Sequence, residues 1–369
     1  MYLLYPTYTD SREFLDQRIK AVEEDSHIET FLASQVTKVA GHVGDYEITI
    51  ETEGREETFH VGVIVVATGS DLFEPVGMYG YGEDPRVITQ MAFEAVMRRG
   101  DLKAKEIVMI QCVGARIDER PYCSRHCCLV TIMNAVVLKE RAPDKNITVL
   151  FRGLTEYIQD FDRAQELGVR FIRYDPPTLP QVGDGVISVE DAKTGMKHQI
   201  AYDLIVLATP LVPRMGAPEM ARMLKIPVDE WGFLVEPQTK LRPGEHVPSG
   251  VFVAGAAHWP AIIGECIDQG HGAACRALVP IEVGTVEKEP IVSSIDQEIC
   301  RGCGQCAETC QFQAIELITG EDGIPQARLD EFLCTGCGVC ASVCPCGAIS
   351  VDHLPDLQIR AILETAMAG

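Results

Sequence analysis

CRGCGQCAETC, at residues 300–310, decides the fold of the C-terminal part of this chain. A second run, CTGCGVCASVCP at residues 334–345, repeats its cysteine pattern. In both runs two, two and three residues separate successive cysteines. This spacing is typical of a domain that holds two [4Fe–4S] clusters, in which the fourth cysteine of each run ligates the cluster of the other run.

The spacing therefore assigns the eight cysteines to two crossed sets of ligands. The first set is Cys300, Cys303, Cys306 and Cys344, and the second set is Cys334, Cys337, Cys340 and Cys310. The alternative is a pair of four-cysteine zinc sites, which rarely need a repeated run with crossed ligation. Cys346 is a ninth cysteine of this region, and we expect it to pack in the core.

Composition excludes several classes of protein. The chain has 369 residues, of which 46% are hydrophobic and 23% charged, so it is globular with room for two or three domains. A formal net charge of −22 disfavours nucleic acid and anionic membranes as partners. The sequence contains no apolar run of the about 20 residues that a membrane span needs, and no secretory signal is recognisable. Fifteen cysteines in mostly metal-type spacings favour a cytoplasmic location.

Strands and helices alternate through the middle of the chain. Continuous apolar runs predict buried strands at residues 61–68, 106–111, 147–151, 169–174 and 204–209. Helices are expected at residues 130–140 and 161–167. The alternation predicts a doubly wound α/β domain at about residues 100–215. An antiparallel ribbon is expected at residues 34–53, a strand at 250–255, a helix at 261–277, a linker at 280–290 and a last helix at 357–367.

Two motifs resemble the strand ends that approach FAD in two-dinucleotide-domain flavoproteins. They are VIVVATG (residues 63–69) and GVFVAG (residues 250–255), the second followed by a helix. The residues expected to bind FAD are Ala67, Thr68, Gly69, Ala254, Gly255, Ile263 and Glu265. His258 follows the second motif, and a structural role is expected for it. No side chain is expected to act as an acid or base, because the cofactors carry the chemistry.

The glycine loop that holds the ADP half of FAD has no counterpart in the 369 residues. No G-x-G-x-x-G follows a first strand. We therefore expect FAD to be shared with another chain, which supplies the missing first βαβ unit. The predicted strand 106–111 leads into CVGAR (residues 112–116) instead of a second glycine loop, which argues against NAD(P)H binding.

A third group of cysteines lies in the predicted α/β domain. Its members are Cys112, Cys123, Cys127 and Cys128. We expect them at the end of one strand and the start of the next helix, where the helix N-terminus favours thiolates. The set predicts a third [4Fe–4S] cluster, with zinc or free thiols as alternatives, although adjacent cysteines are unusual for zinc.

QCVGAR and RPYCSRHCC, within residues 111–128, resemble the inserted-cluster motif of the heterodisulfide reductase A-subunit family and of related quinone-interacting oxidoreductases. YGYG (residues 79–82), VITQ with FE (residues 87–94) and GVRFIRY (residues 168–174) also match. The resemblance implies an α/β, thioredoxin reductase-like two-dinucleotide-binding-domain flavoprotein fold with an incomplete first Rossmann unit. A C-terminal α+β two-[4Fe–4S] ferredoxin domain completes the expected fold.

The resemblance also implies an electron-transfer subunit of a heterodisulfide reductase-like complex. Expected partners are proteins similar to the B and C subunits of heterodisulfide reductase, hydrogenase- or dehydrogenase-linked subunits, and the chain with the missing βαβ unit. Flavin-based bifurcation is an option, but Ala92 and Met133 stand where bifurcating members usually carry a glutamate and a lysine. A non-catalytic ferredoxin adaptor with a vestigial flavoprotein domain and an NAD(P)H-dependent reductase stay open as alternatives.

Five segments are expected along the chain. They are a partial FAD-binding domain at residues 1–98, a central Rossmann-like domain with a cluster at 99–215, a return segment of the FAD-binding domain at 216–285, a two-cluster ferredoxin domain at 290–355 and a C-terminal helix at 356–369.

Overall fold

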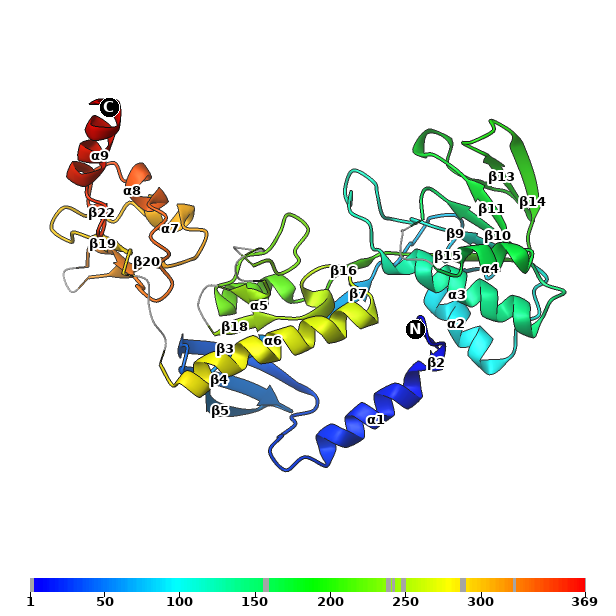
Figure 1. The fold of residues 1–369 in the computed structure, drawn as a ribbon, viewed down its shortest axis with the longest axis horizontal. Coiled ribbons are helices and arrows are strands. Elements are labelled where there is room, and N and C mark those ends of the chain that lie inside the picture. Colours follow the sequence, from blue (N-terminus) through cyan, green and yellow to red (C-terminus); the bar gives the residue numbers. More distant parts are fainter. Residues whose placement is uncertain are drawn as a thin grey trace. The chain divides into compact units, whose positions relative to one another are not determined.

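The computed structural model describes residues 3–154, 159–236, 240, 243–246, 250–285, 290–320 and 323–368. The chain forms two compact units (Figure 1). The first unit comprises Met1–Thr30, Gly69–Arg214 and Trp259–Cys266, and the second comprises Phe31–Thr68, Met215–His258 and Ile267–Gly369. The predicted α/β domain therefore lies in the first unit, and the cysteine-rich domain lies in the second.

A five-stranded parallel sheet forms the centre of the first unit, in the order β11-β10-β9-β15-β8. Its strands are β8 (Val87–Thr89), β9 (Glu106–Ile110), β10 (Asn146–Phe151), β11 (Arg170–Arg173) and β15 (Leu204–Leu207). Helices α2 (Gln90–Arg99), α3 (His126–Arg141) and α4 (Phe161–Glu166) connect them. The prediction of a parallel α/β domain is confirmed, although the three-residue strand β8 was too short to predict.

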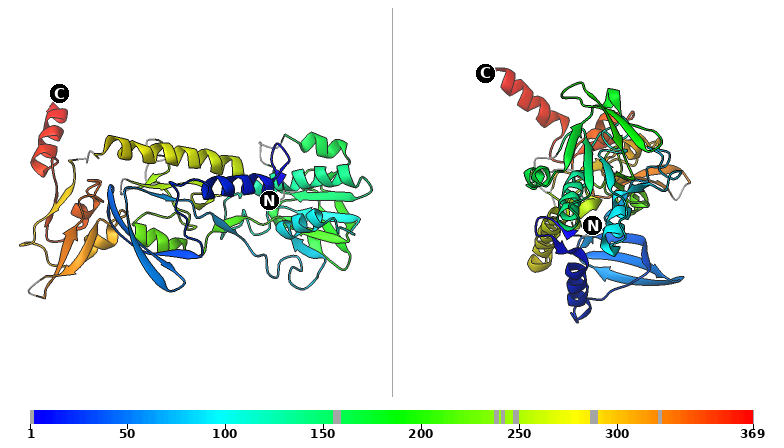
Figure 2. Two further views of the ribbon diagram at one scale, coloured as in Figure 1. Left: turned by 90° about the horizontal axis from the view of Figure 1, so that it is seen from below. Right: turned by 90° about the vertical axis from the view of Figure 1, so that its right-hand side faces the viewer.

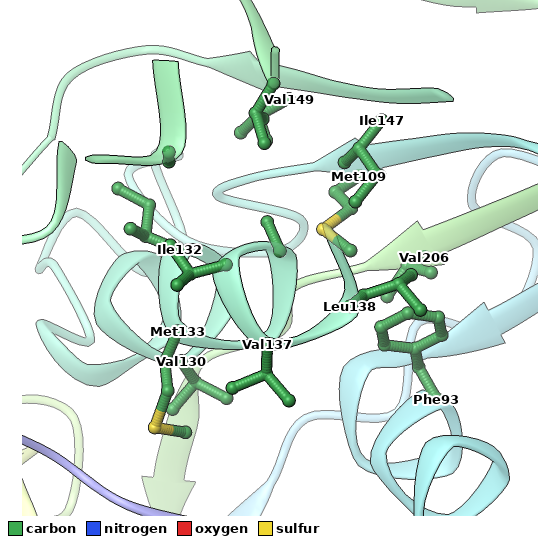
Figure 3. Packing of buried hydrophobic residues seen from close by; sticks show 14 of the residues in the cluster. Phe93, Met109, Val130, Ile132, Met133, Val137, Leu138, Ile147, Val149 and Val206 are labelled. Atoms are coloured by element: carbon green, nitrogen blue, oxygen red, sulfur yellow. The ribbon is translucent and has the colours of Figure 1, made fainter. Parts of the chain in front are cut away.

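Each face of this sheet buries its own apolar layer, because successive strand residues point to opposite sides. On one face Met109 and Ile147 pack against α2 and α3 (Figure 3). Met133 of α3 is fully buried in this layer. On the other face Ile110 and Ile205 pack against a three-stranded antiparallel sheet, visible in Figures 1 and 2. That sheet consists of β12 (Gln181–Val182), β13 (Val186–Glu190) and β14 (Lys197–Ala201).

The remaining elements of the first unit are short, apart from one helix. Helix α1 (Ser11–Glu23) begins after Asp10, whose side chain accepts a hydrogen bond from the N–H of Arg12. The others are β1 (Leu3–Leu4), β2 (Thr9–Asp10), β7 (Ser70–Leu72), β16 (Leu211–Pro213) and the 3₁₀ turn η1 (Pro176–Thr178). Strands β7 and β16 pair antiparallel with each other.

The strand predicted at residues 61–68 is broken in the structure, so that part of the prediction is wrong. Its first residue ends β5 (Arg55–Val61), the last strand of the antiparallel ribbon formed with β3 (Ser34–His42) and β4 (Asp45–Thr52). The chain then turns at Gly62, whose carbonyl accepts a hydrogen bond from the N–H of Gly44. Strand β6 (Ile64–Val66) follows and pairs in parallel with β18 (Val251–Val253).

Helix α6 (Ile263–Val283) is longer than the predicted helix at residues 261–277. It continues through Pro280, where the sequence predicted a linker, and the carbonyl of Pro280 accepts a hydrogen bond from the N–H of Gly284. Residues 286–289 of the expected linker lie outside the described residues.

Among the helices of the described ranges, none is both long and apolar enough to cross a membrane. The elements around α6 are α5 (Ala217–Leu224), β17 (Glu245–His246) and the 3₁₀ turn η2 (Gly255–Ala257).

The cysteine-rich domain consists of two antiparallel ribbons and short helices. β19 (Ser293–Ile295) pairs with β22 (Ile349–Val351), and β20 (Ile315–Thr319) pairs with β21 (Pro325–Leu329). Helices α7 (Gln305–Thr309) and α8 (Val339–Val343) follow the two cysteine loops. The predicted last helix is confirmed as α9 (Asp356–Ala368).

Three buried polar side chains lock α3 to the sheet and to α2. The Oγ1 of Thr131 accepts hydrogen bonds from the Nε2 of Gln90 (3.0 Å) and the Nε2 of Gln111 (2.8 Å). The Nε2 of Gln90 also donates to the carbonyl of Cys127 at 3.2 Å. This network fixes the first turn of α3, which carries two of the predicted ligands.

We expect Thr131→Val to weaken this region by about 1–3 kcal/mol, because a side chain of the same shape leaves two buried amides without their acceptor. Hydrogen exchange measured by mass spectrometry on peptides from β9 and α3 would report the change as a loss of amide protection. Thr319→Val, at an exposed position of β20, is the control. Equal amide protection in the wild type and in Thr131→Val would show that the hydrogen-bond network does not contribute to stability.

Candidate cluster and flavin sites

Glycines shape the two loops that carry the ferredoxin cysteines. Gly302 and Gly336 have positive φ values of +64° and +65°. A Cβ would lie 2.0 Å from the carbonyl oxygen of Pro325 in the first case and 2.3 Å from that of Ile291 in the second. Both loops therefore adopt a tight conformation that only glycine allows.

One cavity of this domain is lined by cysteines from both runs. Its volume is about 140 Å³, and its wall includes Cys310 of the first run together with Cys334, Cys337 and Cys340 of the second. Phe312 and other apolar side chains complete the wall. The structure thus brings together the four thiols of the second crossed set in a small, mostly apolar space.

The four thiols of the first crossed set also lie in one part of the domain. Cys306 is buried, and Cys300 and Cys344 pack against the same small core. Cys303 is exposed and, like Cys300, interacts electrostatically with Cys306. Burial raises the pKa of Cys306 above its usual range.

Backbone N–H groups point at the sulfur atoms of this domain. Ala314 donates to the Sγ of Cys310, Ser293 to that of Cys334 and Ala348 to that of Cys344, each at 3.3 Å. Such donors favour thiolates and, in iron–sulfur proteins, tune the reduction potential. For Cys344, burial opposes ionisation, yet the N–H of Ala348 and the other donors hold its pKa below the ordinary value.

The third group of cysteines surrounds the carboxyl end of β9. The buried residue Gln111 follows β9, and Cys112 comes next, with a positive φ of +59°. Cys127 and Cys128 occupy the first turn of α3, as predicted, and both are buried. Cys123 lies exposed in the preceding loop, where its Sγ accepts a hydrogen bond from the N–H of Arg125 (3.4 Å). Cys112 interacts electrostatically with Cys127 and Cys123, so the thiols of this set are neighbours.

These buried thiols do not ionise readily by themselves. Burial raises the pKa of Cys112 to about 11. The hydrogen bond with Cys128 and then burial raise the pKa of Cys127 well above its ordinary value. A metal centre that binds the thiolate form would offset both effects, and its binding would release protons.

Over the ranges that the structure describes, no three Cys, His, Asp or Glu side chains converge closely enough to hold a single metal ion.

The two FAD motifs meet at neighbouring strand ends in the second unit. β6 and β18 are parallel, with Val66 opposite Val253, and the N–H of Ala254 donates to the carbonyl of Val66 at 2.9 Å. Ala67 and Thr68 therefore continue beside Ala254 and Gly255. Ala67 and Thr68 are exposed and Ala254 and Gly255 are buried, at the carboxyl ends of parallel strands, which is where open α/β sheets bind ligands.

The other three residues predicted to bind FAD belong to the first unit. They are Gly69, Ile263 and Glu265. The Oε1 of Glu265 accepts a hydrogen bond from the guanidinium of Arg125 at 2.5 Å, and its Oε2 accepts the N–H of Ile262 at 3.2 Å. Glu265 therefore braces the loop that carries Cys123.

A buried, hydrogen-bonded pair of side chains beside the second motif was not predicted as a pair. His258 was expected to be structural, and its Nε2 hydrogen-bonds the carboxylate of Glu236. Both side chains are almost completely buried. Glu236 lies far from any motif in sequence, so no local signal could have identified it.

Comparison with known proteins identifies the domain and the relatives of the chain. A family model described as "4Fe-4S dicluster domain" matches residues 299–348. The A-type component of the H(2):CoB-CoM heterodisulfide,ferredoxin reductase of Methanothermobacter marburgensis is 34% identical over 326 residues, covering 82% of this chain and 49% of the relative. An A-type iron–sulfur component of the CoB--CoM heterodisulfide reductase of Methanopyrus kandleri is 37% identical over 285 residues, covering 70% and 43%. The chain thus spans about half the length of the curated relatives it matches.

Similar solved structures include a thioredoxin reductase and a bacillithiol disulfide reductase. The thioredoxin reductase of T. acidophilum has 16% sequence identity and a TM-score of 0.44, over 72% of this chain and 78% of its own. The bacillithiol disulfide reductase of Bacillus cereus has 16% identity and a TM-score of 0.45, over 76% of this chain and 81% of its own.

Crossed ligation predicts which cluster each substitution removes. Cys310→Ala should abolish the same electron paramagnetic resonance signal as Cys337→Ala, because both side chains line one cavity. Cys275→Ala, at an exposed cysteine of α6, is the matched control, and it should keep the signals of both clusters. If Cys310→Ala instead removed the signal that Cys303→Ala removes, the ligands would not be crossed.

Proposed function

The chain belongs to the heterodisulfide reductase A-subunit family, and we propose that it is a three-cluster flavoprotein that passes electrons to partner subunits in such a complex. The observation that carries the proposal is the cavity in which Cys310 joins Cys334, Cys337 and Cys340. Neither run supplies four ligands by itself, so the crossed thiols indicate two four-iron clusters of the ferredoxin type, and such clusters carry electrons. When bound, the clusters and the flavin supply the redox chemistry, and the side chains hold and shield them.

A third four-iron cluster is proposed at Cys112, Cys123, Cys127 and Cys128. Three of these thiols are buried and one is exposed. The protein would therefore shield a cluster from solvent at three ligands and leave it accessible at Cys123. The first turn of α3 would orient two ligands and add the positive end of the helix dipole.

FAD is proposed to bind at the carboxyl ends of β6 and β18 in the second unit. Ala67, Thr68, Ala254 and Gly255, at these strand ends, would contact the cofactor, whereas the roles of Gly69, Ile263 and Glu265, which belong to the first unit, stay predictions from the sequence. The N–H of Gly255 is held by the Oε1 of Gln269 at 2.9 Å, which fixes the turn that would face the flavin. Met133 lies in the apolar core, so bifurcation of the kind that uses a lysine at this position is not part of the proposal.

Iron and acid-labile sulfide should each amount to about twelve per chain after anaerobic purification, from three four-iron clusters. Cys127→Ala should lower both to about eight and leave the ferredoxin signals unchanged, because its side chain lies in the other unit. Wild-type protein with about eight iron and a fully loaded ferredoxin domain would rule out the third cluster.

NADH and NADPH should not reduce the isolated protein. The sequence after β9 is CVGAR (residues 112–116) and not a glycine loop, and the ring of Phe73 packs against Gly114, where a Cβ would lie 2.3 Å from it. Anaerobic titration followed by visible absorption should show bleaching with dithionite only. Stoichiometric bleaching by NADH would favour an NAD(P)H-dependent reductase instead.

A further inference from the structure

The buried hydroxyl of Ser293 lies against one of the cysteines of the second crossed set. Ser293 begins β19 and is 2% exposed. Its Oγ lies 3.3 Å from the Sγ of Cys340. A cysteine that binds iron is a thiolate without a proton, so in that state the hydroxyl donates and the sulfur accepts. The backbone N–H of Ser293 also donates to the Sγ of Cys334 at 3.3 Å, so this one residue contacts two thiols of the set.

The internal repeat of the domain shows which residue stands in the place of Ser293 beside the first cysteine run. One glycine of each run lies against a backbone carbonyl, which an added Cβ would meet: Gly302 lies against Pro325, and Gly336 lies against Ile291. The two glycines hold the same place in their runs, so these two carbonyls correspond. Two residues further along, Ser293 corresponds to Ala327, which is also 2% exposed.

The two crossed sets therefore receive different side-chain hydrogen bonds. Cys306 is the third cysteine of the first run, as Cys340 is of the second, and the corresponding Ala327 has no hydroxyl to offer it. The first set has a thiol donor at another ligand, since the Sγ of Cys346 hydrogen-bonds that of Cys344 at 3.7 Å. A thiol is a weaker donor than a hydroxyl.

A hydroxyl at this place opposes the effect of the apolar cavity. Burial disfavours negative charge on sulfur and raises the pKa of Cys340, whereas the hydrogen bond from Ser293 acts in the opposite direction. Reduction adds one negative charge to a cluster, so a donor at a ligand sulfur stabilises the reduced state more than the oxidised state. The hydroxyl should therefore make the second crossed set easier to reduce.

We propose that Ser293 raises the reduction potential of the cluster held by the second crossed set above the value that its apolar cavity alone would give. Ser293 binds no iron in this account and acts through the sulfur of Cys340, so it is a positioning residue. The inference rests on the proposed pair of clusters in this domain. It adds a residue that shifts an electron shared by the pair toward the second set.

Redox titration of the full chain with its clusters loaded, followed by electron paramagnetic resonance, tests the proposal. Ser293→Ala gives the second run the residue that the first run has. At the wild-type midpoint it should shift the ratio of oxidised to reduced second-set cluster by about tenfold toward oxidised, which is about 59 mV for one electron. The signal of this cluster is the one that Cys337→Ala abolishes, and the potential of the other cluster should stay at its wild-type value.

Two further variants separate the hydrogen bond from general effects on the domain. Ser294→Ala is the matched control, because the hydroxyl of Ser294 hydrogen-bonds that of Ser350 at 2.8 Å and not a thiol. It should leave both potentials unchanged. Ser293→Thr keeps the hydroxyl and should restore most of the potential that Ser293→Ala loses. Iron content should equal that of the wild type in all three variants.

Four results would overturn the role of Ser293. They are an unchanged potential in Ser293→Ala, equal shifts of both clusters, a shift in Ser293→Thr as large as in Ser293→Ala, and loss of iron from Ser293→Ala. Loaded clusters with unchanged potentials would leave the proposed electron-transfer function intact. A wild-type ferredoxin domain without iron would instead overturn the proposed function itself.

Discussion

Burial of thiol groups that do not ionise readily by themselves is the constraint on which this structure depends. Cys112 and Cys127 have strongly raised pKa values, and the pKa values of Cys306 and Cys340 are raised by burial as well. A thiolate in such a place needs a cation, and iron at each sulfur would supply it. The loops that carry these cysteines then have to be tight, which explains the glycines at positive φ.

The sequence predicted the elements whose signals are local. The cysteine spacing predicted the ferredoxin repeat, and continuous runs rich in β-branched residues predicted β9, β10 and β15 of the parallel sheet. Features that depend on contacts between distant residues could not be predicted. The break at Gly62 depends on pairing with Gly44, and the pairing of His258 with Glu236 joins residues with no shared motif. The extension of α6 through Pro280 also escaped prediction, since proline usually ends a helix.

The proposed flavin site depends on two strands that lie far apart in the sequence. β6 and β18 pair in parallel and align their carboxyl ends, as a ligand site in an open α/β sheet requires. The two motifs could be recognised in the sequence one by one, but their pairing could not, because it depends on contacts between distant residues.

The central claim is that three groups of four cysteines each hold a four-iron cluster. Anomalous diffraction at the iron absorption edge, from crystals of anaerobically prepared protein, tests it most directly. The account predicts three iron peaks, one beside Cys112 and Cys127, one beside Cys310 and Cys337, and one beside Cys344. A zinc-edge peak beside Cys112, or iron peaks in the ferredoxin domain alone, would contradict it.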